Sequence, residues 1–421
     1  MKVSAPAAES GGGLFGWWGE ATPEAKRALV AASLGWMLDS FDVMLYSLVL
    51  AYLMADLGIS TTTAGLLGSL TLLASAAGGM IFGVIADVYG RTRALTGSIL
   101  IYSIFTAACG LAQSVWQLAV FRVLLGIGMG GEWASGAALV SETWPAKHRG
   151  KALGFMQSSW ALGYAAAAAI TAIVMPIWGW RAVFFVGVAP ALITVWVRRR
   201  VEEPEIWRET QATPADASAP AFGDIFRGRL LPLTIAITLM NACTMFAWWG
   251  FNLWIPAYLS LPIEKGGVGL SPYAMSGLVI AMQVGMWFGY VTFGFISDTF
   301  GRKLTYIVYV LAAAVLIFAY TSTRNPLALL LLGPFVAFFG TGYFSGFGAI
   351  TAEIYPTRIR ARAQGLTYNI GRVASAVAPF AVGSMAATQG FHVALSTTAI
   401  AFLLAAVAWI WIPETKGQEL A

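Results

Sequence analysis

Long runs of apolar residues fill most of this 421-residue chain, and short polar segments separate them. A membrane-spanning helix needs about 20 predominantly apolar residues. Every run reaches that length, so the pattern predicts an all-α membrane protein with twelve transmembrane helices. Their expected ranges are 27–54, 61–88, 94–113, 115–141, 152–176, 179–198, 230–260, 271–298, 303–323, 326–353, 362–388 and 391–412.

The composition also favours a membrane protein. Hydrophobic residues make up 58% of the chain and charged residues only 11%, whereas soluble domains carry roughly 25% charged residues. The 17 Trp and 46 Gly agree with this, because Trp suits the membrane–water interface and Gly lets membrane helices approach closely. With only two Cys and two His in the chain, we expect no disulfide framework, no metal site and no cofactor.

Polar segments divide the predicted helices into two groups of six. We expect an N-terminal cytoplasmic tail over residues 1–26, one six-helix bundle over 27–198, a second over 230–412, and a C-terminal tail over 413–421. Residues 199–229 are charged at first and then rich in Ala, Pro and Ser. That composition predicts a cytoplasmic linker between the bundles rather than a folded domain.

The positive charges indicate how the helices are oriented. If both termini are cytoplasmic, 20 of the 25 Lys and Arg lie in cytoplasmic tails and loops, and only Arg181, Lys265 and Arg324 lie on the other side. Cytoplasmic loops of membrane proteins carry an excess of Lys and Arg, so the distribution predicts N-in, C-in topology. The formal charge of +5 then reflects membrane orientation rather than binding to nucleic acid.

Two motifs occur once in each predicted bundle. One joins the second helix to the third and the eighth to the ninth, and the other follows the fourth and tenth helices. Equivalent residues, such as Gly83 and Gly294, are 211 positions apart in both motifs, which indicates a duplicated six-helix unit. The motifs are Gly83-x-x-x-Asp87-x-x-Gly90-Arg91-x-Arg93 with Gly294-x-x-x-Asp298-x-x-Gly301-Arg302-Lys303, and Glu142-x-Trp144-Pro145 then Arg149 with Glu353-x-Tyr355-Pro356 then Arg360.

The doubled loop motif is a signature of the major facilitator superfamily, which the chain resembles over essentially its whole length. Arg122-x-x-x-Gly126-x-Gly128-x-Gly130 is similar to a second motif of that family. The resemblance implies two pseudo-symmetric six-helix bundles that rock around a central cavity. It implies a monomeric, multi-pass transporter of the bacterial inner membrane, and not an enzyme.

The loop motifs place carboxylates beside arginines at cytoplasmic helix ends. Such a cluster can clamp neighbouring helices in one state and release them in the other, and Gly90 and Gly301 permit the tight turn. The alternative is that the arginines only anchor the loops; the carboxylates favour a gate, because they add nothing to that anchoring. The expected gating residues are Gly83, Asp87, Gly90, Arg91, Arg93, Glu142, Arg149, Asp298, Gly301, Arg302, Glu353 and Arg360.

Once the tails, loops and interfacial motifs are set aside, five ionisable residues remain within the predicted helices, namely Asp39, Asp42, Arg122, Glu132 and Arg372. A charge at mid-bilayer costs about 2.5–3.5 kcal/mol on insertion scales, so each should face a cavity or a partner. The first four lie in the first and fourth helices, which line the cavity in the family that the chain resembles. Arg372 lies roughly half-way along the eleventh.

Asp39 and Asp42 are three residues apart and share one helix face. Two such carboxylates in a poorly solvated site do not both ionise cheaply, so we expect them to bind a transported proton. The Asp39-Ser40-Phe41-Asp42 run also resembles an Asp-Gly-Phe-Asp element of aromatic-acid proton symporters. The alternative is a structural pair neutralised by Arg122. Glu132, about 15 Å beyond Arg122 on an ideal helix, either relays the proton or pairs with a neighbouring loop.

Arg122 and Arg372 carry permanent forked donors that suit a carboxylate. One arginine from each half can hold an organic anion in a shared cavity, with Asn369 one turn from Arg372. For Arg122, an ion pair with Asp39 or Asp42 is an equal alternative. Further binding residues are expected on the seventh, eighth and tenth helices, although interface anchoring is an alternative for the two Trp. These residues are Trp248, Trp249, Asn252, Gln283 and Tyr343.

Together these residues predict a secondary active transporter that carries a small organic anion, such as lactate, sialate or an aromatic acid, together with a proton. The stretch Gly131–Gly154 also resembles the sialate/lactate proton-symporter branch. Other transport modes stay open: exchange of a drug or metabolite for protons, or facilitated passage of a neutral metabolite. A membrane sensor that keeps the same fold is a further alternative.

Overall fold

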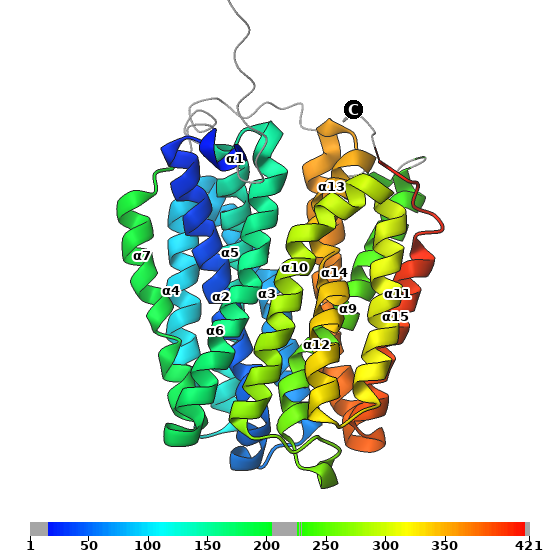
Figure 1. The fold of residues 1–421 in the computed structure, drawn as a ribbon. Helices are drawn as coiled ribbons and strands as arrows, with labels where there is room; N and C mark the ends of the chain where they lie inside the picture. The colour runs from blue at the N-terminus through cyan, green and yellow to red at the C-terminus, as the bar shows by residue number, and fades with distance from the viewer. Residues whose placement is uncertain (1–15, 204–224, 227, 229, 417–421) are drawn as a thin grey trace, which may run out of the picture.

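The computed structural model describes residues 16–203, 225, 226, 228 and 230–416, and it is built almost entirely from helices. The predicted linker over 199–229 lies largely outside the described residues, as do most of the two predicted tails. The outermost described parts, α1 and the segment that follows α15, lie at the same end of the helix bundle (Figure 1). We call this the terminal end.

The described residues of the first half form seven helices. They are α1 (Gly16–Gly19), α2 (Pro23–Leu57), α3 (Thr61–Tyr89), α4 (Arg91–Cys109), α5 (Val115–Thr143), α6 (Ala146–Val186) and α7 (Ala189–Arg200). Polar residues at the predicted breaks start several of them, because a hydroxyl can accept from the free backbone N–H groups of the first turn. Thr22, Ser60 and Ser114 act in this way on α2, α3 and α5.

The second half repeats the arrangement. Its elements are α9 (Leu230–Ser260), the 3₁₀ turn η2 (Ile263–Lys265), α10 (Pro272–Phe300), α11 (Arg302–Thr321), α12 (Pro326–Thr341), α13 (Phe344–Ile354), α14 (Thr357–Gln389) and α15 (Phe391–Ala408). Ser271 caps α10 just as Ser60, 211 positions earlier, caps α3. The duplicated sequence therefore folds into duplicated helices.

Eleven helices in the described parts are long and apolar enough to cross a membrane. One of them, His148–Leu192, has 45 residues and covers two of the twelve predicted runs. Gly179 lies inside it with φ 74° and ψ 179°, a non-helical conformation that favours glycine. The boundary predicted between residues 176 and 179 therefore coincides with a kink in α6 at Gly179.

Within each half, the helices pack into a bundle of their own. In the first half α2 packs on α6, and α3 and α4 pack on α5; in the second, α14 and α15 pack on α9. The halves meet mainly along α3 with α14, α6 with α10, and α2 with α9. Figure 1 shows the first half on the left, from blue to green, and the second on the right, from green to red.

Contacts between the halves gather at the end remote from α1. Ser47 Oγ of α2 donates a hydrogen bond of 2.5 Å to Leu253 O of α9. Phe380 N of α14 donates one of 3.1 Å to Ser69 Oγ of α3. Gly65 lies so close to Pro379 O that a Cβ there would collide with it. Small residues thus let α3 and α14 approach closely at this end.

Candidate functional site

A cavity lies between the two halves, and both contribute to its wall. Side chains reach it from α2, α3, α5 and α6 of the first half and from α9, α10, α13 and α14 of the second. Half of the lining residues are aromatic. The aromatic side chains are Trp36, Trp160, Trp248, Trp249, Tyr290, Phe344 and Tyr368.

Three of the tryptophans form a continuous aromatic surface across the halves. The rings of Trp36 and Trp160 are 4.7 Å apart between centroids, and those of Trp160 and Trp249 are 5.9 Å apart and nearly perpendicular. Edge-to-face contacts of this kind hold aromatic rings in defined orientations. The cavity therefore offers broad, rigid apolar faces to a small molecule.

Arg372 provides a permanent positive charge on this wall. Its Nη2 donates a hydrogen bond of 3.2 Å to Ser75 Oγ of α3, and both residues line the cavity. A Cβ on Gly79 would lie 3.5 Å from its Nη1, so the arginine extends along α3 of the opposite half. An arginine has five donors, and its planar fork suits a carboxylate.

The other predicted binding residues fall into two groups. Trp248 and Trp249 line the cavity, whereas Asn369, Asn252, Gln283 and Tyr343 are not among its lining residues. Three of the latter make contacts within the helix packing. Asn252 Nδ2 donates to Met44 Sδ, Gln283 Nε2 to Val279 O, and Tyr343 Oη to Thr244 O.

Asp39 lies next to the cavity, but neither Asp39 nor Asp42 lines it. Both are buried, and Asp39 follows the cavity residue Trp36 by one helical turn. Asp39 is within electrostatic range of Arg372. Oδ2 of Asp39 and both carboxylate oxygens of Asp42 lack a hydrogen-bond partner. Burying a carboxylate without a hydrogen-bond partner is costly.

Arg122 is fully buried and lies away from the cavity lining. Its guanidinium stacks on the Tyr46 ring, 3.9 Å from the centroid, a favourable cation–π contact. Its Nε and Nη1 have no hydrogen-bond partner. Among the ion pairs of the described residues, none joins Arg122 to Asp39 or Asp42. Neither predicted role of Arg122, anion contact or carboxylate partner, is seen in this conformation.

Glu132 of α5 is also fully buried, and it contacts α2 rather than a loop. A Cβ on Gly35 would collide with Glu132 Oε1. Both carboxylate oxygens of Glu132 lack a hydrogen-bond partner. Asp39, one turn beyond Gly35 on α2, lies within electrostatic range of Glu132. The predicted pairing of Glu132 with a loop is thus absent, and its carboxylate lies near that of Asp39.

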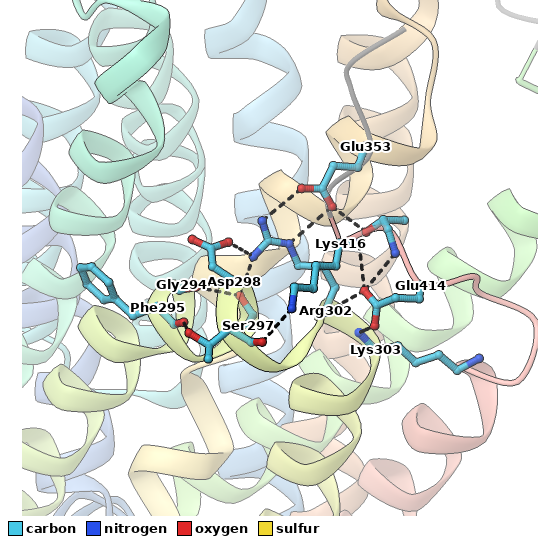
Figure 2. A network of polar contacts seen from close by, with 11 residues as sticks. Gly294, Phe295, Ser297, Asp298, Arg302, Lys303, Glu353, Glu414 and Lys416 are labelled. Carbon is cyan, nitrogen blue, oxygen red and sulfur yellow. Dashed lines mark hydrogen bonds and ion pairs between the residues drawn. The ribbon is translucent and has the colours of Figure 1, made fainter.

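The two repeated motifs meet at the terminal end of each half. In the first half, Arg91 pairs with Glu142 at 2.8 Å. In the second, Arg302 pairs with Glu353 at 3.1 Å and with Asp298 (Figure 2). The loop motif is therefore joined to the motif that follows the fourth or tenth helix.

Not every predicted gating residue takes part in these pairs. Arg93 Nη1 donates to Tyr89 O, and Arg149 is exposed. Gly90 and Gly301 have φ 112° and 102°, as the predicted tight turns require. Gly83 and Gly294 have open space where a Cβ would lie. The side chains of Asp87 and Arg360 lie outside those that the structure describes.

Each cluster also contains one further glutamate that the motif comparison missed, namely Glu203 in the first half and Glu414 in the second. Gly90 and Gly301 precede α4 and α11 but have no side chain to cap them. Glu203 accepts hydrogen bonds from Thr92 N and Arg93 N at 3.1 and 3.3 Å. Glu414 accepts from Arg302 N and Lys303 N at 2.8 and 3.1 Å (Figure 2). A carboxylate at a helix N-terminus accepts hydrogen bonds from the free N–H groups, and its negative charge interacts favourably with the helix dipole.

Sequence signals for the missed residues existed but were weak. Glu203 and Glu414 are also 211 positions apart, yet only this shared offset distinguishes them from other charged residues. Trp36 and Trp160 occur in the middle of apolar runs rather than at their ends, where interface anchors are expected. Among the described residues, no group of three or more His, Cys, Asp or Glu could hold a metal ion.

The family model of the Major Facilitator Superfamily matches residues 32–282 and 259–421. A putative metabolite transport protein of Haemophilus influenzae is 36% identical over 94% of this chain and 97% of its own length. A probable 4-methylmuconolactone transporter of Cupriavidus pinatubonensis is 32% identical, over 96% and 94% of the two chains. The sialic acid transporter NanX of Escherichia coli is 30% identical, over 92% and 93%.

Solved structures share the fold. A D-xylose-proton symporter superposes with a TM-score of 0.74 at 20% identity, over 94% of this chain and 100% of the other. At that identity the likeness concerns the fold alone. The family match and the relatives extend over nearly the whole chain and include both halves. The chain therefore belongs to the Major Facilitator Superfamily, and it is a multi-pass membrane transporter rather than an enzyme.

Proposed function

We propose that the protein carries a small organic acid anion across the bacterial inner membrane together with a proton. The observation that carries this proposal is the position of Arg372, a permanent cation on the wall of an aromatic cavity, within electrostatic range of the buried Asp39. An anion and a proton can then be bound at neighbouring positions. Relatives named for 4-methylmuconolactone and sialic acid support an organic acid as the substrate.

Arg372 is the proposed anion-binding group. A carboxylate can take the place of Ser75 as acceptor, because a charged acceptor forms a stronger hydrogen bond with a guanidinium than a hydroxyl does. The rings of Trp160 and Trp249 would contact the apolar body of the same ligand. This division of contacts favours an acid with a flat or apolar body over a small hydrophilic one.

Asp39 is the proposed proton-binding group, with Asp42 and Glu132 as its neighbours. When Asp39 is ionised, its negative charge competes with the substrate for Arg372. Protonation of Asp39 removes that competition and frees the guanidinium for the anion. Anion and proton would therefore bind more tightly together than either does alone, which is the linkage that symport requires.

Alternating access follows from the way in which the halves meet. They touch closely at the end remote from α1, where Ser47 contacts Leu253 and Ser69 contacts Phe380. The ion-pair clusters of Arg91 and Arg302 lie at the terminal end, each inside one half. We propose that breaking the first set of contacts, while the clusters rearrange, exposes the cavity to the other side.

The membrane arrangement is proposed as twelve crossings with both termini in the cytoplasm. Gly179 would divide the 45-residue span into two crossings. The excess of Lys and Arg in the segments assigned to the cytoplasm supports this orientation. We further propose that one chain suffices for transport, because a single chain encloses the cavity.

The test is uptake of labelled benzoate, cis,cis-muconate, sialic acid and lactate into proteoliposomes, with and without an inward proton gradient. Symport predicts that at least one of these acids accumulates above its equilibrium level only when the gradient is imposed. Accumulation that ignores the gradient, or transport of cations alone, would contradict the proposal.

A further inference from the structure

Tyr102 of α4 is fully buried at the meeting point of α2, α4 and α5. Its hydroxyl donates to Gly35 O of α2, but the bond is long, at 3.4 Å. In a continuous α-helix, Gly35 O is also the acceptor for the N–H of Asp39. This long bond holds the hydroxyl only weakly. Among the hydrogen bonds of the described residues, the hydroxyl oxygen donates this one and accepts none.

Carboxylates from two helices lie near this hydroxyl. Glu132 approaches α2 at Gly35, the same residue to which the hydroxyl donates. Asp39 lies one turn farther along α2 and Asp42 one turn beyond that. All three carboxylates lie within electrostatic range of the Tyr102 phenol.

None of these carboxylates is fully satisfied. Both oxygens of Glu132, both of Asp42 and Oδ2 of Asp39 have no hydrogen-bond partner. The other groups that face them are Thr106 and Cys109 of α4, which lie near Asp42, and Arg372 of α14, which lies near Asp39. A hydroxyl both donates and accepts hydrogen bonds, whereas an ionised carboxylate only accepts. Tyr102, whose phenol is within electrostatic range of both Asp39 and Glu132, is thus suited to pass a proton between these two carboxylates.

We propose that the Tyr102 hydroxyl relays the transported proton between Asp39 and Glu132; this inference rests on the proton symport proposed above. The phenol releases its own proton to the Glu132 carboxylate while it takes up the proton held by Asp39. One O–H bond breaks and one forms at the phenol, which ends the step neutral. Asp39 ends ionised and Glu132 ends neutral. The proton moves towards the terminal end of the bundle, since Gly35 precedes Asp39 on α2.

A purely structural role for Tyr102 makes a different prediction. Its ring fills the space between helices, and α4 packs so closely on α5 that a Cβ on Gly128 would lie 2.7 Å from Tyr102 N. Tyr102→Phe keeps the ring and removes only the hydroxyl. Packing alone therefore predicts little change in transport, whereas a relay predicts loss of the proton-driven part only.

The experiment compares wild type, Tyr102→Phe and the matched control Tyr164→Phe in proteoliposomes. Tyr164 is another fully buried tyrosine of the first half, and it lies outside the carboxylate cluster. A relay predicts that Tyr102→Phe lowers proton-driven uptake of the labelled acid by at least about tenfold, while counterflow exchange stays within about twofold. The control should match wild type in both assays.

Unchanged driven uptake in Tyr102→Phe, or an equal loss of driven uptake and counterflow, would overturn the relay. If Tyr102→Phe does not fold, 3,5-difluorotyrosine at position 102 keeps the ring and the hydroxyl but makes the hydroxyl more acidic. The relay then predicts a shift in the pH dependence of driven uptake, and an unshifted profile overturns it. Wild-type uptake that ignores a proton gradient would refute symport itself, a result distinct from a failure of the relay alone.

Discussion

Arg372 of α14 donates a hydrogen bond of 3.2 Å to Ser75 of α3, so this arginine on the cavity wall already bridges the two halves. A bound anion would compete for the same guanidinium. The interaction therefore connects substrate binding to the packing of α3 against α14. It also brings the charge close to Asp39, which belongs to the first half.

Replacing Arg372 with Lys should weaken anion binding. An ammonium keeps the charge but cannot present two parallel donors to a carboxylate. Hydrogen bonds to charged groups contribute about 1.5–3 kcal/mol, so we expect a loss of affinity of about 10- to 100-fold. Equilibrium binding of labelled substrate to the purified protein measures it. Arg324→Lys, at an exposed position outside the cavity, is the control. Equal substrate affinities in the two variants would show that Arg372 contributes to helix packing rather than to anion binding.

Asparagine at position 39 should separate proton coupling from substrate movement. Asp39→Asn removes the ionisable group and leaves a side chain of the same size beside Trp36. We expect proton-driven accumulation to be abolished, while counterflow exchange of labelled for unlabelled acid continues. Asp42→Asn should act in the same direction if both carboxylates share the proton. Driven uptake at the wild-type level in Asp39→Asn would remove this residue from the mechanism.

The aromatic wall should set the preference among acids. Trp249→Ala removes the ring that meets Trp160 at 5.9 Å. Aromatic contacts contribute about 0.5–1.5 kcal/mol beyond the area that they bury, so affinity for benzoate should fall by about 2- to 12-fold. Affinity for lactate, which has no ring, should change less. Trp116→Ala, at a position 77% exposed, is the control, and equal losses for the two acids would contradict a contact with the ring.

The paired glutamate caps should stabilise the terminal end. Glu414→Ala leaves the first N–H groups of α11 without their acceptor, and lost N-terminal caps cost about 0.5–2 kcal/mol. We therefore expect a lower apparent Tm in detergent at neutral pH, and a similar drop for Glu203→Ala. Glu264→Ala, exposed at the other end, is the control. A Tm equal to that of the control would show that the caps add no stability.

The contribution of Glu414 should also depend on pH. Partial burial acts to raise the pKa of this carboxyl, but hydrogen bonds from the backbone N–H groups of Lys416, Arg302 and Lys303 outweigh it and hold the pKa below its ordinary value of 4.5. A lowered pKa in the folded state means that the stabilisation is complete above the ordinary value and is lost as the pH falls through the lowered one. The Tm difference between wild type and Glu414→Ala should therefore vanish in acid.

Much of the fold followed from the sequence because a bilayer imposes simple rules. Apolar length predicted the helices, and the common offset of two motifs predicted the duplication. The position of Arg372 on the cavity wall could be predicted because a charge inside an apolar run needs a cavity or a partner. The same rule predicts that Asp39 and Glu132 face a cavity or a partner. The break of α6 at Gly179 also lies at the boundary predicted between residues 176 and 179.

The polar contacts could not be predicted in the same way. Gln283 donates to the backbone carbonyl of Val279, four residues earlier on its own helix, and Tyr343 donates to a carbonyl of α9. Amides and hydroxyls can be satisfied by backbone groups inside a bundle, so their presence does not reveal which way they face. Trp36 and Trp160 show the converse, because an apolar side chain in an apolar run gives no sign that it lines a cavity.

Movement of the proton with the substrate can be measured most directly as a pH change outside de-energised proteoliposomes. Addition of an unlabelled acid anion that the protein carries should make a weakly buffered external medium more alkaline in wild type, because a proton enters with each anion. The same addition should give no alkaline shift in Asp39→Asn. Entry of the labelled anion into wild-type vesicles without any alkaline shift would contradict proton symport.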